Sequence, residues 1–404
     1  MLRFFFLLSL LFPFAFAGDD VELSDTISGK KAPDLDVDDR TESTMDLYED
    51  GHSRRYPDRI YEGAKMLNMS PEFVWGCWRV MEGLYKRDKV GHSKVLKQMK
   101  RDFPDSGVSE TGRALMWQVL MLENFDFQYE KEYKRSFKEA KQALSNAMYT
   151  PGNDAWELFL MGAILGIDGI HHMRKEEWIT AINQGFEGVS TLSRARKKAP
   201  DFIDAKLGDG LWLYWRSLIA MNIPGMKAFK DQRAEGIAMV QEAEKTSVFL
   251  RPACSHALTY IWIEEGKISR AIATGQRLRR KYPNNIINLQ ILGRAQMYKK
   301  DYRAAENTFR RTLSLDSKNK RVRYYLARNF LHKKDYANAE NEMRIYLDMK
   351  IDPIQRGWAN HYLGHILRRQ KRYEDAHKAF GKAYSLTRNK RSKKWLGKMK
   401  KRIQ

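Results

Sequence analysis

The most constraining feature of this sequence is a phrase that occurs twice, with an offset of 34 between its two copies. Residues 299–313 read KKDYRAAENTFRRTL, and residues 333–347 read KKDYANAENEMRIYL. A fixed period of this length is typical of solenoids, in which similar supersecondary units stack and each buries its apolar face against the next. The sequence therefore predicts a repeat architecture.

The repeat frame continues on both sides of this phrase and predicts helices. An offset of 34 places Leu292 and Leu326 at equivalent positions, and likewise Ala305 and Ala339; the frame resumes at Leu363 after three extra residues. Apolar residues recur at helical spacing, and no run shows the sustained alternation of a strand. We therefore expect an all-α protein, a solenoid of helix pairs, with pairs at residues 254–282, 287–315, 321–349 and 357–386.

These units resemble tetratricopeptide repeats, whose pattern has a Leu-Gly pair in the first helix, an Ala-x-x-x-Phe pair in the second and a closing proline. The matching residues here are Leu292-Gly293 and Leu363-Gly364, then Ala305 with Phe309 and Ala376 with Phe380, and finally Pro283. The sequence departs from the pattern at the family's first-helix Trp, where it has Ser255, Leu289, Arg323 and Asn360. The resemblance implies a superhelix with four units over residues 252–388.

Residues 51–251 keep a helical periodicity, but their units are longer. Pro151, Pro200 and Pro252 follow one another at offsets of 49 and 52, and each opens an apolar stretch. Proline is tolerated in the first turn of a helix and rarely later, so these residues mark helix starts in an N-terminal helical repeat region. The stretch from Asp201 to Lys245 is similar to the tetratricopeptide repeat protein 39 group and to related secreted bacterial repeat proteins, a likeness that carries no catalytic motif.

Residues 1–17, MLRFFFLLSLLFPFAFA, resemble a cleavable secretory signal peptide. One Arg precedes an apolar run from Phe4 to Phe16, and the run ends in a small-x-small cleavage pattern at Ala15-Phe16-Ala17. The run is shorter than the ~20 residues that a membrane-spanning helix needs. We expect cleavage after Ala17 and a secreted or periplasmic protein; an uncleaved N-terminal membrane anchor is the alternative.

Charge divides the remaining chain into two parts. Residues 18–50 hold twelve acidic and three basic residues, a net charge of −9, and are expected to be disordered. The whole chain carries +22, so residues 51–404 carry +30. Residues 389–404 are rich in Lys and Arg and predict a basic capping helix. We expect the acidic segment either to shield basic surface in the N-terminal half or to act as a solvated spacer.

The sequence offers little that predicts catalysis or metal binding. It has no Gly-rich phosphate loop, no Gly-x-Ser-x-Gly motif and no Cys-x-x-Cys motif. Cys77 and Cys254 lie among large apolar residues and are expected to be buried free thiols. His361 and His365 have the spacing of a metal pair, with His377 as a candidate third ligand, but an ordinary polar helix face is the preferred interpretation. We predict no enzyme activity, no cofactor and no metal; an enzyme in the N-terminal half is the remaining alternative.

The resemblance implies that the first helices of the four units line a concave groove. The predicted groove residues are Tyr260, Gln290, Arg294, Tyr298, Tyr324, Arg328, Trp358, His361, His365 and Arg369. Arg and aromatic side chains are enriched among the residues that dominate protein interfaces. Merely solvated arginines are the alternative interpretation.

These observations predict a secreted or periplasmic scaffold that binds a protein or peptide partner of acidic character through a basic and aromatic groove. A net charge of +30 also attracts polyanions in general. Nucleic acid, an envelope polymer or an anionic membrane surface is therefore the alternative partner. No small-molecule substrate is expected.

Overall fold

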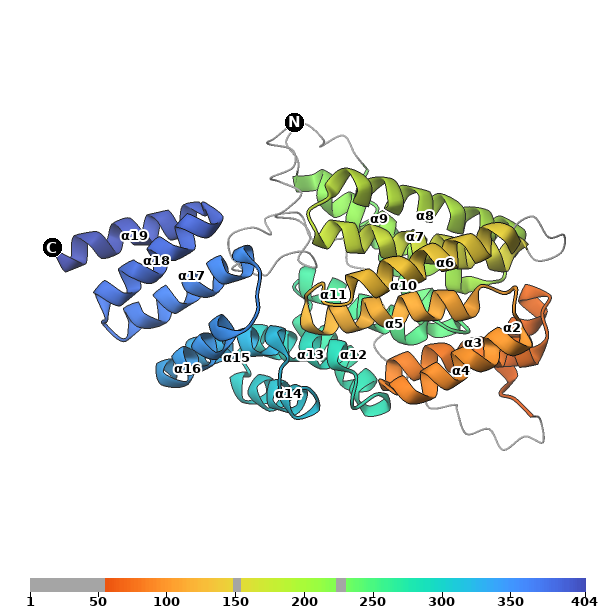
Figure 1. Ribbon diagram of the computed structural model, residues 1–404, viewed down its shortest axis with the longest axis horizontal. Helices are drawn as coiled ribbons and strands as arrows, with labels where there is room; N and C mark the ends of the chain where they lie inside the picture. The colour runs from red at the N-terminus through yellow and green to blue at the C-terminus, as the bar shows by residue number, and fades with distance from the viewer. Residues whose placement is uncertain (1–54, 148–153, 223–229) are drawn as a thin grey trace.

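The computed structural model describes residues 55–147, 154–222 and 230–404, and within these ranges all regular structure is helical (Figure 1). The predicted fold class, an all-α solenoid of helix pairs, is confirmed there. The predicted signal peptide and acidic segment, residues 1–50, lie outside the described residues.

The N-terminal half consists mainly of antiparallel helix pairs. Its helices are α2 (Asp58–Leu67), α3 (Pro71–Lys86), α4 (Lys89–Asp102), α5 (Val108–Asn124), α6 (Glu130–Ala147), α7 (Asp154–Arg174), α8 (Trp178–Lys198), the 3-10 helix η2 (Ile203–Ala205), α9 (Lys206–Asn222) and α10 (Arg233–Thr246). The longest are α7 and α8, with 21 residues each. Both are longer than any helix described in the C-terminal half, but α4 and α10 have only 14 residues each, so the longer helices predicted for this region are found only in part. Pro200, which was predicted to mark a helix start, lies instead in the turn between α8 and η2.

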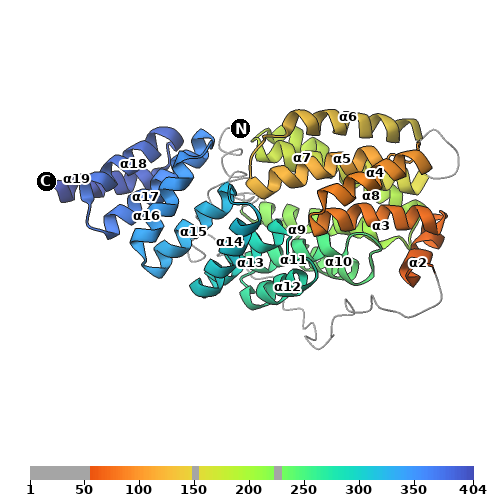
Figure 2. The same cartoon turned by 60° about the horizontal axis from the view of Figure 1, so that its bottom comes forward.

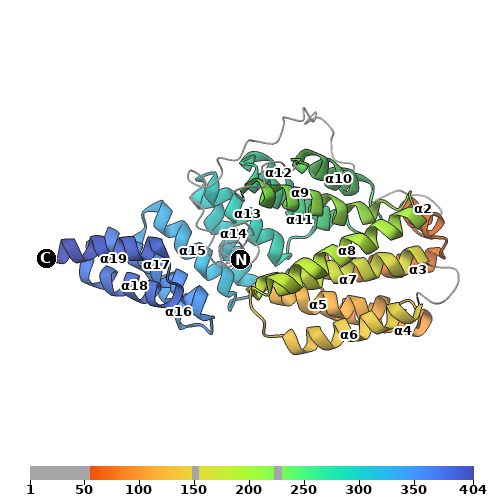
Figure 3. The same cartoon turned by 90° about the horizontal axis from the view of Figure 1, so that it is seen from above.

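The C-terminal half holds four shorter pairs and one final helix. They are α11 (Arg251–Glu264) with α12 (Ile268–Lys281), α13 (Ile286–Tyr298) with α14 (Tyr302–Leu315), α15 (Lys320–Lys333) with α16 (Tyr336–Asp348), α17 (Pro353–Arg369) with α18 (Tyr373–Thr387), and α19 (Lys390–Ile403). Each of the four predicted pairs overlaps one of these observed pairs closely. The end of the molecule formed by α17, α18 and α19 projects away from the rest (Figures 2 and 3).

The repeated Lys-Lys-Asp-Tyr phrase forms the turn inside a helix pair. Lys300 and Lys334 adopt the left-handed backbone conformation, with φ of 66° and 67°, which reverses the chain after α13 and α15. The next residue in each unit, Asp301 or Asp335, caps the second helix by accepting a hydrogen bond from the backbone N–H three residues later. Gly266, at the equivalent position one unit before Lys300, adopts the same conformation with φ of 70°. The repeat in the sequence is therefore a repeat of one turn geometry.

The small residues predicted to pack between helices are buried. Ala305 and Ala339 are fully buried, as are Leu292 and Leu326. In the α13–α14 pair, the ring of Phe309 packs directly over Gly293, so that a Cβ added there would overlap the ring. The glycine of the Leu-Gly motif therefore contacts the phenylalanine of the Ala-x-x-x-Phe motif, because its lack of a side chain leaves room for the ring.

The two cysteines agree with the sequence prediction. Cys77 and Cys254 are both free and buried, as predicted. Burial raises the pKa of both thiols well above the ordinary value. Across the three described ranges, every helix is either too short or too polar to cross a bilayer.

Candidate functional site

Most of the predicted groove residues are buried inside the molecule. Six of the ten have almost no exposed surface: Tyr260, Gln290, Arg294, Tyr324, Arg328 and His361. Tyr298, Trp358 and His365 are half-buried, and Arg369 alone among the ten is exposed. The six buried side chains can shape the wall of an interaction surface, but they cannot contact a partner directly in this structure.

Arg294 shows how these side chains are used within the chain. It is 2% exposed, and it donates a hydrogen bond to the hydroxyl of Tyr260 at 2.5 Å. Its guanidinium also lies 5.1 to 5.9 Å from the ring centroids of Tyr260, Tyr298 and Tyr325. Because these tyrosines come from three successive units, Arg294 ties the units together by cation–π contacts.

The end of α5 covers the face on which the groove was predicted. The backbone carbonyl of Glu123 accepts hydrogen bonds from the side-chain amides of Gln290 (2.6 Å) and Asn319 (3.0 Å). The carbonyl of Phe125 accepts another from Gln355 at 3.0 Å. Three successive units therefore bind the backbone of one N-terminal segment.

Charged side chains reinforce this contact. Lys320 pairs with Asp126 at 2.7 Å, and the Arg321 guanidinium lies 4.6 Å from the ring of Phe125. On the other side, Arg174 of α7 donates to the Asp126 carbonyl at 2.8 Å and lies 5.1 Å from the same ring. Residues 123–126 are thus held between the N-terminal half and the repeats.

The end of α3 makes the same kind of contact one unit earlier. Asn285 donates to the backbone carbonyl of Tyr85 at 3.0 Å, and Tyr282 donates to the carboxylate of Glu82 at 2.8 Å. Asn285 occupies the position that Asn319 occupies in the next unit, so equivalent asparagines receive the ends of two N-terminal helices. The chain folds back so that its first pairs lie against its later ones.

Three of the four accessible residues of the predicted groove, Trp358, His365 and Arg369, lie on α17, which packs near α19, whereas Tyr298 lies on α13. The ring of Trp395 lies 5.0 Å from the His365 ring. Both Arg368 and Lys398 place their cationic groups 4.5 Å from the centroid of Trp395. Together with exposed Arg369, these residues form what we call the C-terminal basic face.

The end of the molecule that carries this face is strongly positive. Residues 353–404 contain sixteen Lys and Arg and two acidic residues, a net charge of +14. One of the two acids, Asp375, is paired with Arg372 at 2.8 Å. Nearly half of the +30 carried by residues 51–404 is therefore concentrated in residues 353–404.

The two histidines of α17 lie beneath α19 and are neutral. The Nδ1 atom of His361 is 2.9 Å from the hydroxyl of Ser392, and its Nε2 atom is 3.2 Å from that of His365. Burial, together with Arg391, lowers the pKa of His361 to about 4. Burial, His361 and the arginines at 368 and 369 lower the pKa of His365 to about 3. Within the described ranges, no group of three or more His, Cys, Asp and Glu side chains is arranged to hold a metal ion.

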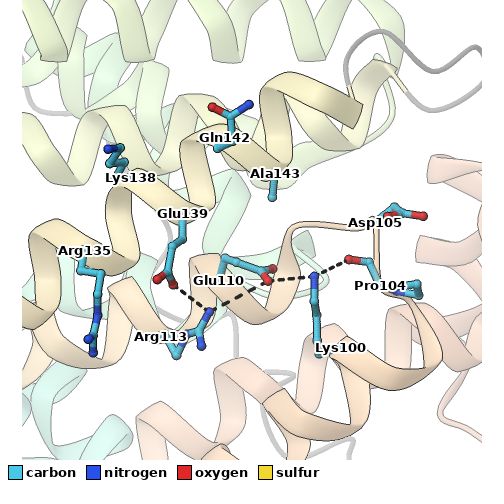
Figure 4. Close-up of a pocket in the computed structure, with 10 residues that line it drawn as sticks. All are labelled: Lys100, Pro104, Asp105, Glu110, Arg113, Arg135, Lys138, Glu139, Gln142 and Ala143. Carbon is cyan, nitrogen blue, oxygen red and sulfur yellow. Dashed lines mark hydrogen bonds and ion pairs between the residues drawn. The ribbon is translucent and has the colours of Figure 1, made fainter.

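A second surface feature is an open cleft of about 820 Å³ formed by α4, α5 and α6 (Figure 4). Glu110 on its floor lies 3.0 Å from Lys100, and Glu139 lies 3.1 Å from Arg113. The cleft thus carries both signs of charge, and two of its acids, Glu110 and Glu139, are paired with lining cations. Among the described residues, its lining includes no His, Cys or Ser, and its carboxylates are those of Asp105, Glu110 and Glu139.

A family model identifies part of this architecture. Residues 292–353 match the model described as tetratricopeptide repeat. This part of the chain is therefore similar to tetratricopeptide repeats. The match spans α13 to α16, the pairs in which the Lys-Lys-Asp-Tyr turn occurs, and no curated protein matches the sequence.

Several solved structures are similar to this chain at low sequence identity. The APC/C hetero-tetramer Cut9-Hcn1 is 14% identical, with a TM-score of 0.53 over 85% of this chain and 58% of that one. The human IFIT1 dimer with PPP-AAAA is 14% identical, with a TM-score of 0.46 over 82% of this chain and 85% of that one. Yeast Tom70 is 13% identical, with a TM-score of 0.43 over 81% of this chain and 74% of that one. This chain therefore spans 58% of the length of its Cut9-Hcn1 match, and that likeness shows the repeat fold alone.

Proposed function

We propose that this protein is a non-enzymatic scaffold, exported from the cytoplasm, that binds an acidic segment of a protein partner on its C-terminal basic face. The observation that carries the proposal is that Trp358, His365 and Arg369, three of the four accessible groove residues, lie on α17 in an end of the molecule, residues 353–404, whose net charge is +14. Tetratricopeptide repeats typically mediate protein interactions, which supports the scaffold role. Export rests on the predicted signal peptide, residues 1–17.

The side chains of this face favour a polypeptide over a uniform polyanion. Trp395, His365 and Trp358 are half-buried, so each offers part of an aromatic surface beside the cations. Arginine and aromatic residues together are typical of the centres of protein interfaces. A nucleic acid or an envelope polymer would also be attracted by the positive charge. The test below therefore includes binding of such a polymer as one of its outcomes.

The test measures the affinity of the mature chain for a fluorescent peptide of alternating Asp, Glu and aromatic residues. The mass of the purified chain also checks the predicted cleavage after Ala17. The double variant Arg369→Glu with Lys398→Glu should weaken binding by about tenfold or more, since it places two like charges against the partner. A matched control, Lys94→Glu with Lys97→Glu on exposed positions of α4, changes the net charge equally and should alter affinity by less than about twofold.

Two results would contradict the proposal. If both double variants weakened peptide binding equally, the protein would be a general polyelectrolyte binder. The second result is tighter binding of single-stranded DNA than of the peptide, with the DNA affinity lost in the Arg369→Glu, Lys398→Glu variant. The partner would then be a phosphate polymer.

A further inference from the structure

Helix α8 carries a row of exposed apolar side chains that the fold does not use. Ile179, Ile182 and Phe186 are 66%, 45% and 64% exposed. Their spacing of three and four residues places them on one face of the helix. Single exposed apolar residues are common on soluble proteins, but a contiguous row of bulky ones marks an interaction site.

The opposite face of α8 packs against the rest of the fold. There Gly188 lies against the backbone of α7, close to Gly162 and Gly166. The exposed row is extended sideways by Trp212 of α9, which is half-buried and whose ring lies 6.4 Å from that of Phe186. Figure 1 shows α8 along the edge of the molecule, with α9 beside it.

The same helix becomes cationic toward its C-terminal end. Arg194, Lys197 and Lys198 are exposed, whereas Glu187 is the one exposed acid that the structure describes between them and the apolar row. Two further acids, Glu176 and Glu177, precede the helix, and Glu177 is paired with Lys175 at 3.0 Å. An apolar face bordered by lysine and arginine is typical of a helix that lies in a membrane interface.

We propose that this face docks on an anionic lipid surface. The apolar row, with Trp212 beside it, enters the boundary between head groups and acyl chains, and Arg194, Lys197 and Lys198 contact the anionic head groups. The charge of the chain favours this occupant over a second copy of the protein, because two chains of +22 repel each other whereas an anionic bilayer attracts both. Three apolar side chains are also too few for the ~800 Å² per partner that a stable dimer buries.

This inference is independent of the acidic partner at the C-terminal basic face, because the two surfaces lie on different helices. It therefore remains testable whether or not that partner is found. The lipid surface would hold the N-terminal half, and the projecting helices α17 to α19 would carry the other site.

The test is flotation of the mature chain with vesicles of phosphatidylcholine, with or without phosphatidylglycerol. The wild-type chain should float with the phosphatidylglycerol vesicles, and Ile179→Ser with Phe186→Ser should reduce its affinity by about tenfold or more. Val90→Ser is the matched control, because Val90 of α4 is 67% exposed but stands outside the row; this variant should bind as the wild type does.

A second measurement does not depend on affinity. An environment-sensitive fluorophore attached at Phe186→Cys should shift to the blue when phosphatidylglycerol vesicles are added, whereas the same label at Val90→Cys should not. The native Cys77 and Cys254 are buried and do not compete for the label.

Three results would overturn the proposal. The double variant could float as the wild type does, which would place any lipid contact elsewhere, for example on α19. Vesicles without phosphatidylglycerol could bind equally well, which would remove the role of the cations. The wild-type chain could sediment as a dimer, bind no vesicles, and become monomeric in the double variant. That result would identify a second copy as the occupant.

Discussion

The α7–α8 and α9–α10 pairs bring their helices together in a different way from the C-terminal pairs. In the α7–α8 pair, glycines of both helices meet, so that a Cβ at Gly188 would lie 2.8 Å from the backbone nitrogen of Gly166. In the α17–α18 pair, glycine faces a side chain instead, and a Cβ at Gly364 would lie 2.8 Å from the ring of Phe380. The first contact is backbone against backbone, and the second is a ring against backbone.

This difference determines which region can tolerate a change. A phenylalanine ring can turn or shift slightly, but two helix backbones in contact can only move apart. Gly210 and Gly236 of the α9–α10 pair approach each other in the same way as the glycines of α7 and α8, with a Cβ at Gly236 only 2.5 Å from the Gly210 carbonyl. The α7–α8 and α9–α10 pairs should therefore be more rigidly specified than the α17–α18 pair.

The largest expected effect follows from this contrast. Gly188→Ala should lower the free energy of unfolding by about 3 kcal/mol, since the added methyl group forces α7 and α8 apart along their length. Urea denaturation, followed by circular dichroism, measures the change. Truncating a neighbouring side chain, as in Leu192→Ala, should fail to restore stability because the obstacle is backbone.

Two substitutions serve as controls for that prediction. Gly166→Ala is on the same pair but has nothing within 4 Å of its added Cβ, so it should be neutral or stabilising by up to about 1 kcal/mol. Gly364→Ala should cost about 1 kcal/mol and should be rescued by Phe380→Leu. Equal losses at Gly188 and Gly364, with equal rescue, would show that the two kinds of pair do not differ.

Lowering the pH should have a smaller and more local effect on stability, which also distinguishes the two regions. The unfolded chain protonates His361 near pH 6.5, but the folded chain does so only at about pH 4, so unfolding takes up a proton between these values. Lowering the pH from 7 to 5 should therefore reduce stability by about 2 kcal/mol through this residue. Hydrogen exchange at α19, corrected for the intrinsic rate at each pH, should show the loss.

The N-terminal half contains a second histidine with a lowered pKa. Burial also lowers the pKa of His171, on α7, to about 4. His361→Gln with His365→Gln should protect α19 at pH 5 and leave the acid response of α7 unchanged. Equal protection of both helices would mean that the pH response is not local to the α17–α19 contact.

The repeat fold was predictable because its signals are local. The Lys-Lys-Asp-Tyr phrase encodes a left-handed turn residue followed by a helix cap, and Leu-Gly with Ala-x-x-x-Phe encodes one inter-helix contact. All of these signals act within a single repeat unit. A sequence period therefore translates directly into helix positions.

The accessibility of the groove was not predictable in the same way. Its cover comes from Glu123 and Phe125, whose contacts with Gln290, Asn319 and Gln355 join residues 167 to 230 positions apart. Two of these contacts use only the backbone carbonyl of Glu123, which any residue type supplies. The sequence around position 123 therefore carries no signal for the contact, and only the three-dimensional path of the chain reveals that most of the groove is filled.

The claim that the N-terminal half covers the repeats is tested most directly by a zero-length crosslink between Lys320 and Asp126, whose side chains lie 2.7 Å apart. Carbodiimide treatment of the monomer, followed by peptide mass spectrometry, should find an amide between these residues, and Asp126→Asn should abolish it. Lys333 and Glu306, which are 3.1 Å apart within the repeats, provide an internal reference. Formation of the Lys333–Glu306 link without the Lys320–Asp126 link would contradict the covered groove.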